Sequence, residues 1–177
     1  MKTCSLYGFI SALAGALLAL ALYFLGFHSD PAKLPAAKAI GICGGLAIVI
    51  TCSVLGVKAR RAEIPEDQGF GYGRALWTGM QIAIVSSFLT AIFNYLYFAF
   101  INPAFIDIML QDQMDKLQAK GISGAQLEQV EKVSRFMMSP GMQSVFTLIG
   151  GLIIGFLISL IVAAFLKRPE PAGPPPV

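Results

Sequence analysis

Four long runs without a charged residue are the feature that most restricts how this chain can fold. They cover residues 5–27, 39–57, 75–101 and 141–166. A helix rises about 1.5 Å per residue, so roughly 20 apolar residues cross a bilayer core about 30 Å thick. Each run is therefore predicted to span a membrane. The chain is predicted to be an all-α integral membrane protein, a four-helix transmembrane bundle.

The composition agrees with this class. Hydrophobic residues make up 56% of the 177 residues and charged residues 13%, whereas soluble domains have about 25% charged residues. The net charge of +3 is too small to indicate nucleic-acid binding. With one histidine and three scattered cysteines, we expect no disulfide framework, no metal and no cofactor. One membrane domain is predicted over residues 1–168, followed by a flexible, proline-rich cytoplasmic tail at 169–177.

Basic residues at the ends of the runs predict the orientation. The KARR segment follows the second run and KR follows the fourth. Lysine and arginine beside a span favour the cytoplasmic side, so both termini are predicted to be cytoplasmic. The first run could be a signal peptide, but its length and the lack of an A-x-A site favour an uncleaved helix.

The segment QGFGYGRALWTGM, residues 68–80, is predicted to be the point where the third span enters the membrane. Its glycines match neither a Walker loop nor a dinucleotide fingerprint. Phe70, Tyr72 and Trp77 are expected at headgroup depth, with Arg74 reaching towards phosphates. A site for a lipid headgroup or another anionic ligand on these residues is the alternative.

Small residues recur every four positions in the predicted spans, a spacing that lets helices approach closely. We expect them to pack the bundle internally; the alternative is a homo-oligomer formed through the fourth span. The helix-packing candidates are Gly41, Gly45, Gly79, Ala83, Ser87, Thr147, Gly151, Gly155 and Ser159.

The third span contains Gln81, Thr90 and Asn94, which are polar but uncharged. Gln81 and Asn94 are expected to form hydrogen bonds across helices. If these three residues lined a polar path instead, the protein would be a channel or carrier. The four runs contain no ionisable acid, base or histidine, which argues against proton-coupled transport and against a membrane hydrolase. No catalytic residue is predicted.

The connection 102–140 is predicted to form an external helical hairpin. Asn102 followed by Pro103 is typical of a helix start. Gly121 is a candidate for the end of this helix, and Ser123 begins a predicted capping box for the next one.

The order of several segments resembles a known family. These segments are GFGYGRALWTG, INPAF, GISGAQLE, SPGM and IGGLIIGFLISLIVAAFLKR. Over about residues 5 to 168 the chain resembles the bacterial membrane family catalogued as domain of unknown function 4199. The resemblance implies a four-helix protein of the bacterial inner membrane, and it implies no activity or catalytic residue.

The leading functional hypothesis is a non-enzymatic accessory or interaction protein. Its expected partners are the lipid bilayer and either another membrane protein or a second copy of the chain. The alternatives are a small oligomeric channel or carrier, and a lipid-handling membrane protein. Nucleic acid is not an expected partner.

Overall fold

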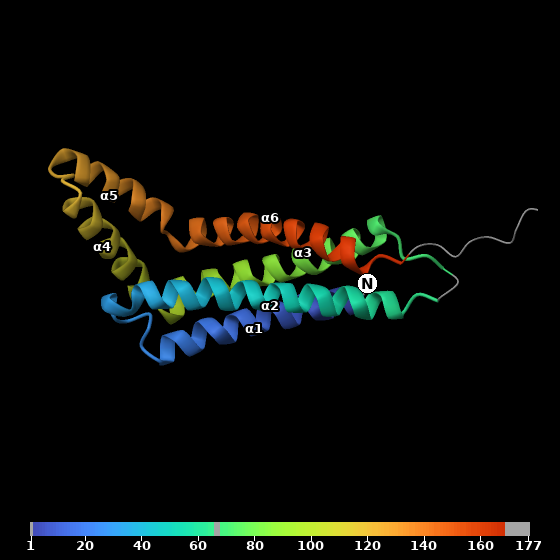
Figure 1. The fold of residues 1–177 in the computed structure, drawn as a ribbon. Coiled ribbons are helices and arrows are strands. Elements are labelled where there is room, and N and C mark those ends of the chain that lie inside the picture. The colour runs from blue at the N-terminus through green and yellow to red at the C-terminus, as the bar shows by residue number, and fades with distance from the viewer. Residues whose placement is uncertain (1, 66–67, 169–177) are drawn as a thin grey trace, which may run out of the picture. The chain divides into compact units, whose positions relative to one another are not determined.

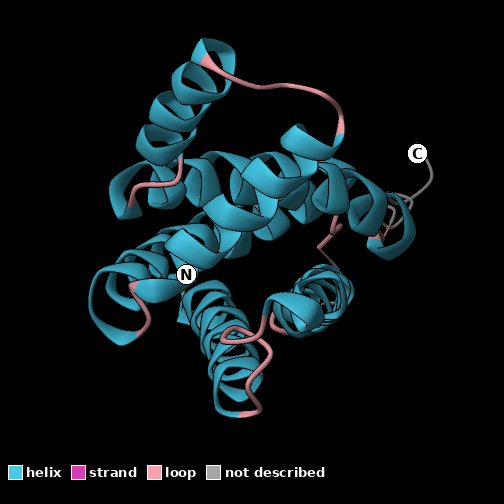
Figure 2. Ribbon diagram, turned by 90° about the vertical axis from the view of Figure 1, so that its left-hand side faces the viewer, coloured by secondary structure: helices cyan, strands magenta, loops and turns pink. Residues whose placement is uncertain are grey.

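The computed structural model describes residues 2–65 and 68–168, and in this part of the chain the regular structure is helical (Figures 1 and 2). The all-α prediction is therefore confirmed. The predicted tail at 169–177 lies outside the described residues. The helices are α1 (Lys2–Phe24), α2 (Leu34–Ala62), α3 (Tyr72–Leu96), α4 (Ala104–Ala119), α5 (Ala125–Met137) and α6 (Pro140–Leu166), with the 3-10 helix η1 (Pro31–Lys33) and the π-helix η2 (Tyr97–Ile101).

Four helical segments are long and apolar enough to cross a membrane. They are Lys2–Phe24, Pro31–Ala62, Tyr72–Ile101 and Pro140–Leu166. These segments contain the four uncharged runs except for residues 25–27, and the second segment begins eight residues before its run and ends five residues after it. This length and composition indicate a membrane protein.

The helix α1 ends three residues before the uncharged run does, because of the backbone at Gly26. Its φ of 76° is in the left-handed region, which glycine adopts without steric cost. The amide of Gly26 then bonds to the carbonyl of Tyr23 at 2.9 Å, and the amide of Phe27 bonds to that of Leu22 at 2.9 Å. This pair of bonds is a Schellman motif, which satisfies carbonyls that the helix end leaves free.

The chain divides into two compact units. The first contains Met1–Ala14, Leu46–Leu89 and Ile149–Val177, and the second contains Gly15–Gly45 and Thr90–Leu148. Each of α1, α2, α3 and α6 contributes residues to both units.

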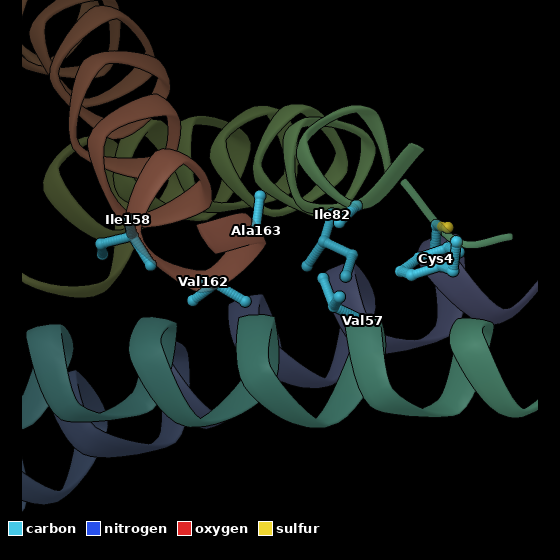
Figure 3. Packing of buried hydrophobic residues seen from close by; sticks show 8 residues of the cluster. Cys4, Val57, Ile82, Ile158, Val162 and Ala163 are labelled. Carbon is cyan, nitrogen blue, oxygen red and sulfur yellow. The ribbon is translucent and has the colours of Figure 1, made fainter. Parts of the chain in front are cut away.

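The core of the first unit gathers side chains from four helices (Figure 3). Cys4 comes from α1, Val57 from α2, Ile82 from α3 and Val162 from α6, and each is at most 8% exposed. In lipid such packing depends on close van der Waals contact and not on the expulsion of water. This unit therefore owes its cohesion to side-chain fit.

The core of the second unit is built largely from aromatic rings. Tyr97 and Phe98 of η2 pack with Phe105 of α4 and with Leu34, the first residue of α2. The rings of Phe98 and Phe105 are stacked with centroids 6.2 Å apart. Tyr23 of α1 meets Tyr97 edge to face at 6.2 Å. Offset and edge-to-face arrangements are the favoured ones for aromatic pairs.

The caps of α4 and α5 differ from the predictions at two of three places. Asn102 does not cap α4 with its side chain, which instead donates to the Tyr97 hydroxyl at 3.2 Å. The capping box at Ser123 is also wrong, because the N-cap of α5 is Gly124 with no side-chain bond. Gly121 is confirmed as a helix terminator, with φ of 86° and a bond to the Gln118 carbonyl at 2.9 Å.

Candidate functional site

Six of the predicted packing residues meet in pairs where α3 approaches α6 in the first unit. A methyl group added to Gly79 would lie 2.6 Å from the hydroxyl oxygen of Ser159, and one added to Gly151 would lie 2.6 Å from that of Ser87. A methyl group on Gly155 would overlap the methyl group of Ala83. The small-residue face of α6 is therefore occupied within the chain at these three positions.

The glycines predicted to pack on α2 make no such close approach to another helix. A methyl group on Gly41 or Gly45 would meet no atom within 4 Å. The close approaches on this helix are at Gly44, 2.8 Å from Leu18, and at Gly56, 2.5 Å from Ile82. The four-residue spacing identified a glycine-bearing helix but not the face that it uses.

Asn94 forms the cross-helix hydrogen bond that was predicted for it. Its amide nitrogen donates to the hydroxyl oxygen of Thr147 at 2.6 Å, within the second unit. Thr147, which was predicted as a helix-packing residue, therefore contacts α3 through a hydrogen bond. Thr90 and Gln81 are both half-buried, and Gln81 lines a pocket in the first unit.

The four residues predicted at the membrane interface do not share one environment. Phe70 is 1% exposed and belongs to the core of the first unit, which differs from the predicted headgroup position. Its amide and carbonyl pair with those of Arg168 at 3.1 and 2.8 Å. Tyr72 and Trp77 are 40% and 60% exposed, and the Arg74 guanidinium donates to the Gly69 carbonyl at 3.0 Å.

Arg168 fixes the segment that precedes α3. Its guanidinium Nη2 donates to three carbonyls, those of Ile64 at 3.2 Å, Pro65 at 2.8 Å and Gln68 at 2.8 Å. Nη2 carries two hydrogens, so at least one of them is shared between two of these carbonyls. From the sequence, Arg168 was expected only to help set the orientation of the chain in the membrane.

Residues 64, 68 and 70, together with Arg60 of α2 and the first turns of α3, line an open pocket of about 420 Å³. Arg60 was not predicted from the sequence to line this pocket. The spacing i, i+3, i+4 and i+7 of the lining residues on α3 is the signal that could have identified their common face. The lining residues are Arg60, Ile64, Gln68, Phe70, Arg74, Trp77, Thr78 and Gln81.

A buried polar cluster in the second unit was not predicted. Nδ1 of His28 lies 2.5 Å from the hydroxyl of Tyr97, and the His28 ring stacks on Phe105 with centroids 4.3 Å apart. Burial lowers the pKa of His28 below its ordinary value. The imidazole is therefore neutral near pH 7, and its Nδ1 can accept a hydrogen bond from the Tyr97 hydroxyl.

The helices α4 and α5 are joined by polar side chains. Gln113 donates to the Ser134 hydroxyl at 3.2 Å, and Arg135 pairs with Asp107 at 3.4 Å. On the other side of α4, Asp112 pairs with Lys116 at 2.7 Å and with Lys38 of α2 at 3.2 Å. The hydrogen bond from Lys116, followed by that from Lys38, lowers the pKa of Asp112. These contacts link α4 to α2 and to α5.

The comparisons with known proteins identify a family. No curated protein and no solved structure matches the chain. The family described as "Protein of unknown function (DUF4199)" matches residues 6–168. This range includes the pocket, the α3–α6 pairs, the His28 cluster and the α4–α5 pair. The chain therefore belongs to the DUF4199 family.

Proposed function

We propose that this protein is a non-enzymatic accessory protein of the bacterial inner membrane that binds another membrane protein. In this proposal α1, α2, α3 and α6 cross the bilayer as a four-helix bundle, both termini are cytoplasmic, and α4 and α5 lie on the external side. The proposal is supported by an apolar surface on α5, formed by Val133, Phe136 and Met137.

These three side chains are 56%, 65% and 43% exposed. Their spacing of three and four residues places them on one side of α5. An adjoining side of α5 is engaged with α4 through the buried Ser134. Covering a side chain such as Phe136 contributes about 1.5–3 kcal/mol, so this surface favours an apolar partner.

The charges beside this surface favour a protein over a lipid headgroup layer. Two acidic residues, Glu128 and Glu131, and two basic residues, Lys132 and Arg135, lie along the same helix. A helix that lies on an anionic membrane surface is rich in lysine and arginine, whereas the rim of a protein interface carries polar groups of both signs. The balanced charge of α5 therefore supports a protein partner.

The proposal can be tested by photocrosslinking in intact cells. A photoreactive amino acid at position 136 is expected to capture one defined membrane protein. The same group in place of Glu128, on the charged side of α5, is the matched control and is expected to capture none. In purification from mild detergent, Phe136→Asp should release that partner. Crosslinks from position 136 to lipid alone, or equal capture from both positions, would contradict the proposal.

The alternatives differ in their support. The channel hypothesis needs Asn94 on a polar path, but its amide already donates to Thr147. A homo-oligomer through α6 would need the face that α3 occupies at Gly151 and Gly155. Gly41 and Gly45 leave a glycine face on α2 without such contacts, so a second copy of the chain could pack there.

A further inference from the structure

The pocket beside the start of α3 combines cationic, aromatic and polar side chains. Arg74, Trp77, Thr78 and Gln81 line it from one face of α3, and Arg60 lines it from α2. Its volume of about 420 Å³ is within the range of small-molecule sites, about 300–1,000 Å³. All of these residues belong to the first unit.

Two arginines, Arg60 and Arg74, line this pocket, and its described lining includes no carboxylate. Arg74 uses Nη1 to hold the Gly69 carbonyl, which leaves most of its five N–H donors for other acceptors. Arg60 uses Nη1 for Glu63 at 2.5 Å. Hydrogen bonds from Thr3 and then from Arg60 lower the pKa of Glu63, so this carboxylate stays ionised and orients Arg60.

We propose that this pocket binds a phosphate group. Two guanidinium groups are suited to phosphate oxygens, because each can offer two parallel N–H donors. The Gln81 amide offers a further donor deeper along α3. Trp77 is 60% exposed and forms an aromatic wall beside the charges, as in sites at the membrane interface.

A second pocket favours a phosphate group that is carried by a lipid. This pocket, of about 130 Å³, is lined by Cys4, Ser5, Ile84, Val85 and again Gln81. Gln81 is thus shared by a charged pocket and a predominantly apolar one. A headgroup at Arg60 and Arg74 with an acyl chain along Ile84 and Val85 would use both. The inference is independent of the α5 surface.

Trp77 is the only tryptophan of the chain and so reports on its own pocket. We would titrate the full-length protein, in neutral detergent, with brominated phosphatidylglycerol and follow the quenching of Trp77 fluorescence. The matched probe is diacylglycerol with the same brominated chains, which carries no phosphate group. Inorganic phosphate, added alone and as a competitor, forms the third arm.

For a lipid headgroup we expect saturable quenching by phosphatidylglycerol, at lower concentrations than by diacylglycerol. For free phosphate we expect a saturable change in Trp77 emission with inorganic phosphate alone. Either result supports a phosphate site and identifies its source. Equal quenching by the two lipids, with no response to inorganic phosphate, would overturn the proposal.

Variants distinguish binding at this pocket from a general effect of positive charge on the protein. Arg74→Gln and Arg60→Gln are each expected to weaken binding about tenfold, as for the loss of a charge-assisted hydrogen bond. Lys58→Gln removes the same charge from an exposed residue that does not line the pocket and should change binding less than about twofold. Equal effects of Lys58→Gln and Arg74→Gln would also overturn it. Arg74→Lys keeps the charge and should bind more weakly than the unaltered protein.

Discussion

At Gly155 a single methyl group separates close packing from overlap. Gly155→Ala would place that group against Ala83, and we expect it to lower the free energy of unfolding by about 1–3 kcal/mol. Gly150→Ala is the matched control on α6, because a methyl group there meets no atom within 4 Å. Unfolding in a detergent titration measures both changes.

Ala83→Gly added to Gly155→Ala moves the methyl group from one helix to the other. We expect this double variant to be more stable than Gly155→Ala alone, although glycine in a helix costs about 1 kcal/mol relative to alanine. Equal stability of Gly155→Ala and Gly150→Ala would show that α3 and α6 do not approach this closely.

His28 gives the fold a dependence on pH. Its pKa is lowered by burial, so the unfolded chain binds a proton at a higher pH than the folded chain does. The contribution to stability is therefore present above the ordinary value of 6.5 and is lost as the pH falls below it. We expect the melting temperature to fall between pH 7 and pH 5, and His28→Gln, the loss of the only histidine, to flatten this dependence. An unchanged slope in His28→Gln would contradict this account.

Some residue contacts could be predicted from the sequence and others could not. Asn94 within an uncharged helix has few ways to satisfy its amide, so a cross-helix hydrogen bond was predictable. The partners of His28 were not, because Tyr97 lies far away in sequence and meets it only after η2 and the loop before α2 have formed. Phe70 was placed at the interface from its residue type alone, whereas its pairing with Arg168 buries it.

At the scale of elements, residues 64–65 and 68–70 depend on their attachment to the end of α6. Arg168→Gln removes a guanidinium that donates to three carbonyls. We expect the amide of Phe70 to exchange its hydrogen at least about tenfold faster, since one bond from a charged donor contributes roughly 1.5–3 kcal/mol. Hydrogen exchange measured by mass spectrometry checks this.

Lys167→Gln is the control for that experiment, because it removes a charge from the neighbouring exposed residue. Exchange at Phe70 should be unchanged in this variant. If both variants accelerated exchange equally, a loss of local charge would explain the effect and the hydrogen bonds of Arg168 would not.

The existence of the elements was easier to predict than their ends. Uncharged runs of this length leave little alternative to helices, because a membrane offers no partner for free backbone groups. The ends depend on local backbone geometry, such as the left-handed Gly26 and the π-helix that closes with the Asn102 amide on the Tyr97 carbonyl at 2.8 Å. The face that a helix buries depends on its neighbours, as Gly44 shows beside Gly41 and Gly45.

At the scale of the whole molecule, the distribution of basic residues predicts the orientation in the membrane. In a variant without the three native cysteines, we would introduce Lys58→Cys or Gln129→Cys. A membrane-impermeant maleimide is expected to label Gln129→Cys in intact spheroplasts and Lys58→Cys only after permeabilisation, because lysine and arginine beside spans remain in the cytoplasm. The reverse pattern, or labelling of both from outside, would contradict the predicted topology.

The three pairs between α3 and α6 also bear on how the chain tolerates sliding. Gly79, Ala83 and Ser87 are evenly spaced, as are their partners Ser159, Gly155 and Gly151. A displacement of α6 by four residues, about 6 Å, would again oppose small residues to small residues, so these three pairs do not by themselves fix the register of α6 against α3. The bond from Asn94 to Thr147 has no such repeat. The hydrogen bond between this amide and this hydroxyl therefore selects one register among those that the evenly spaced small residues would allow.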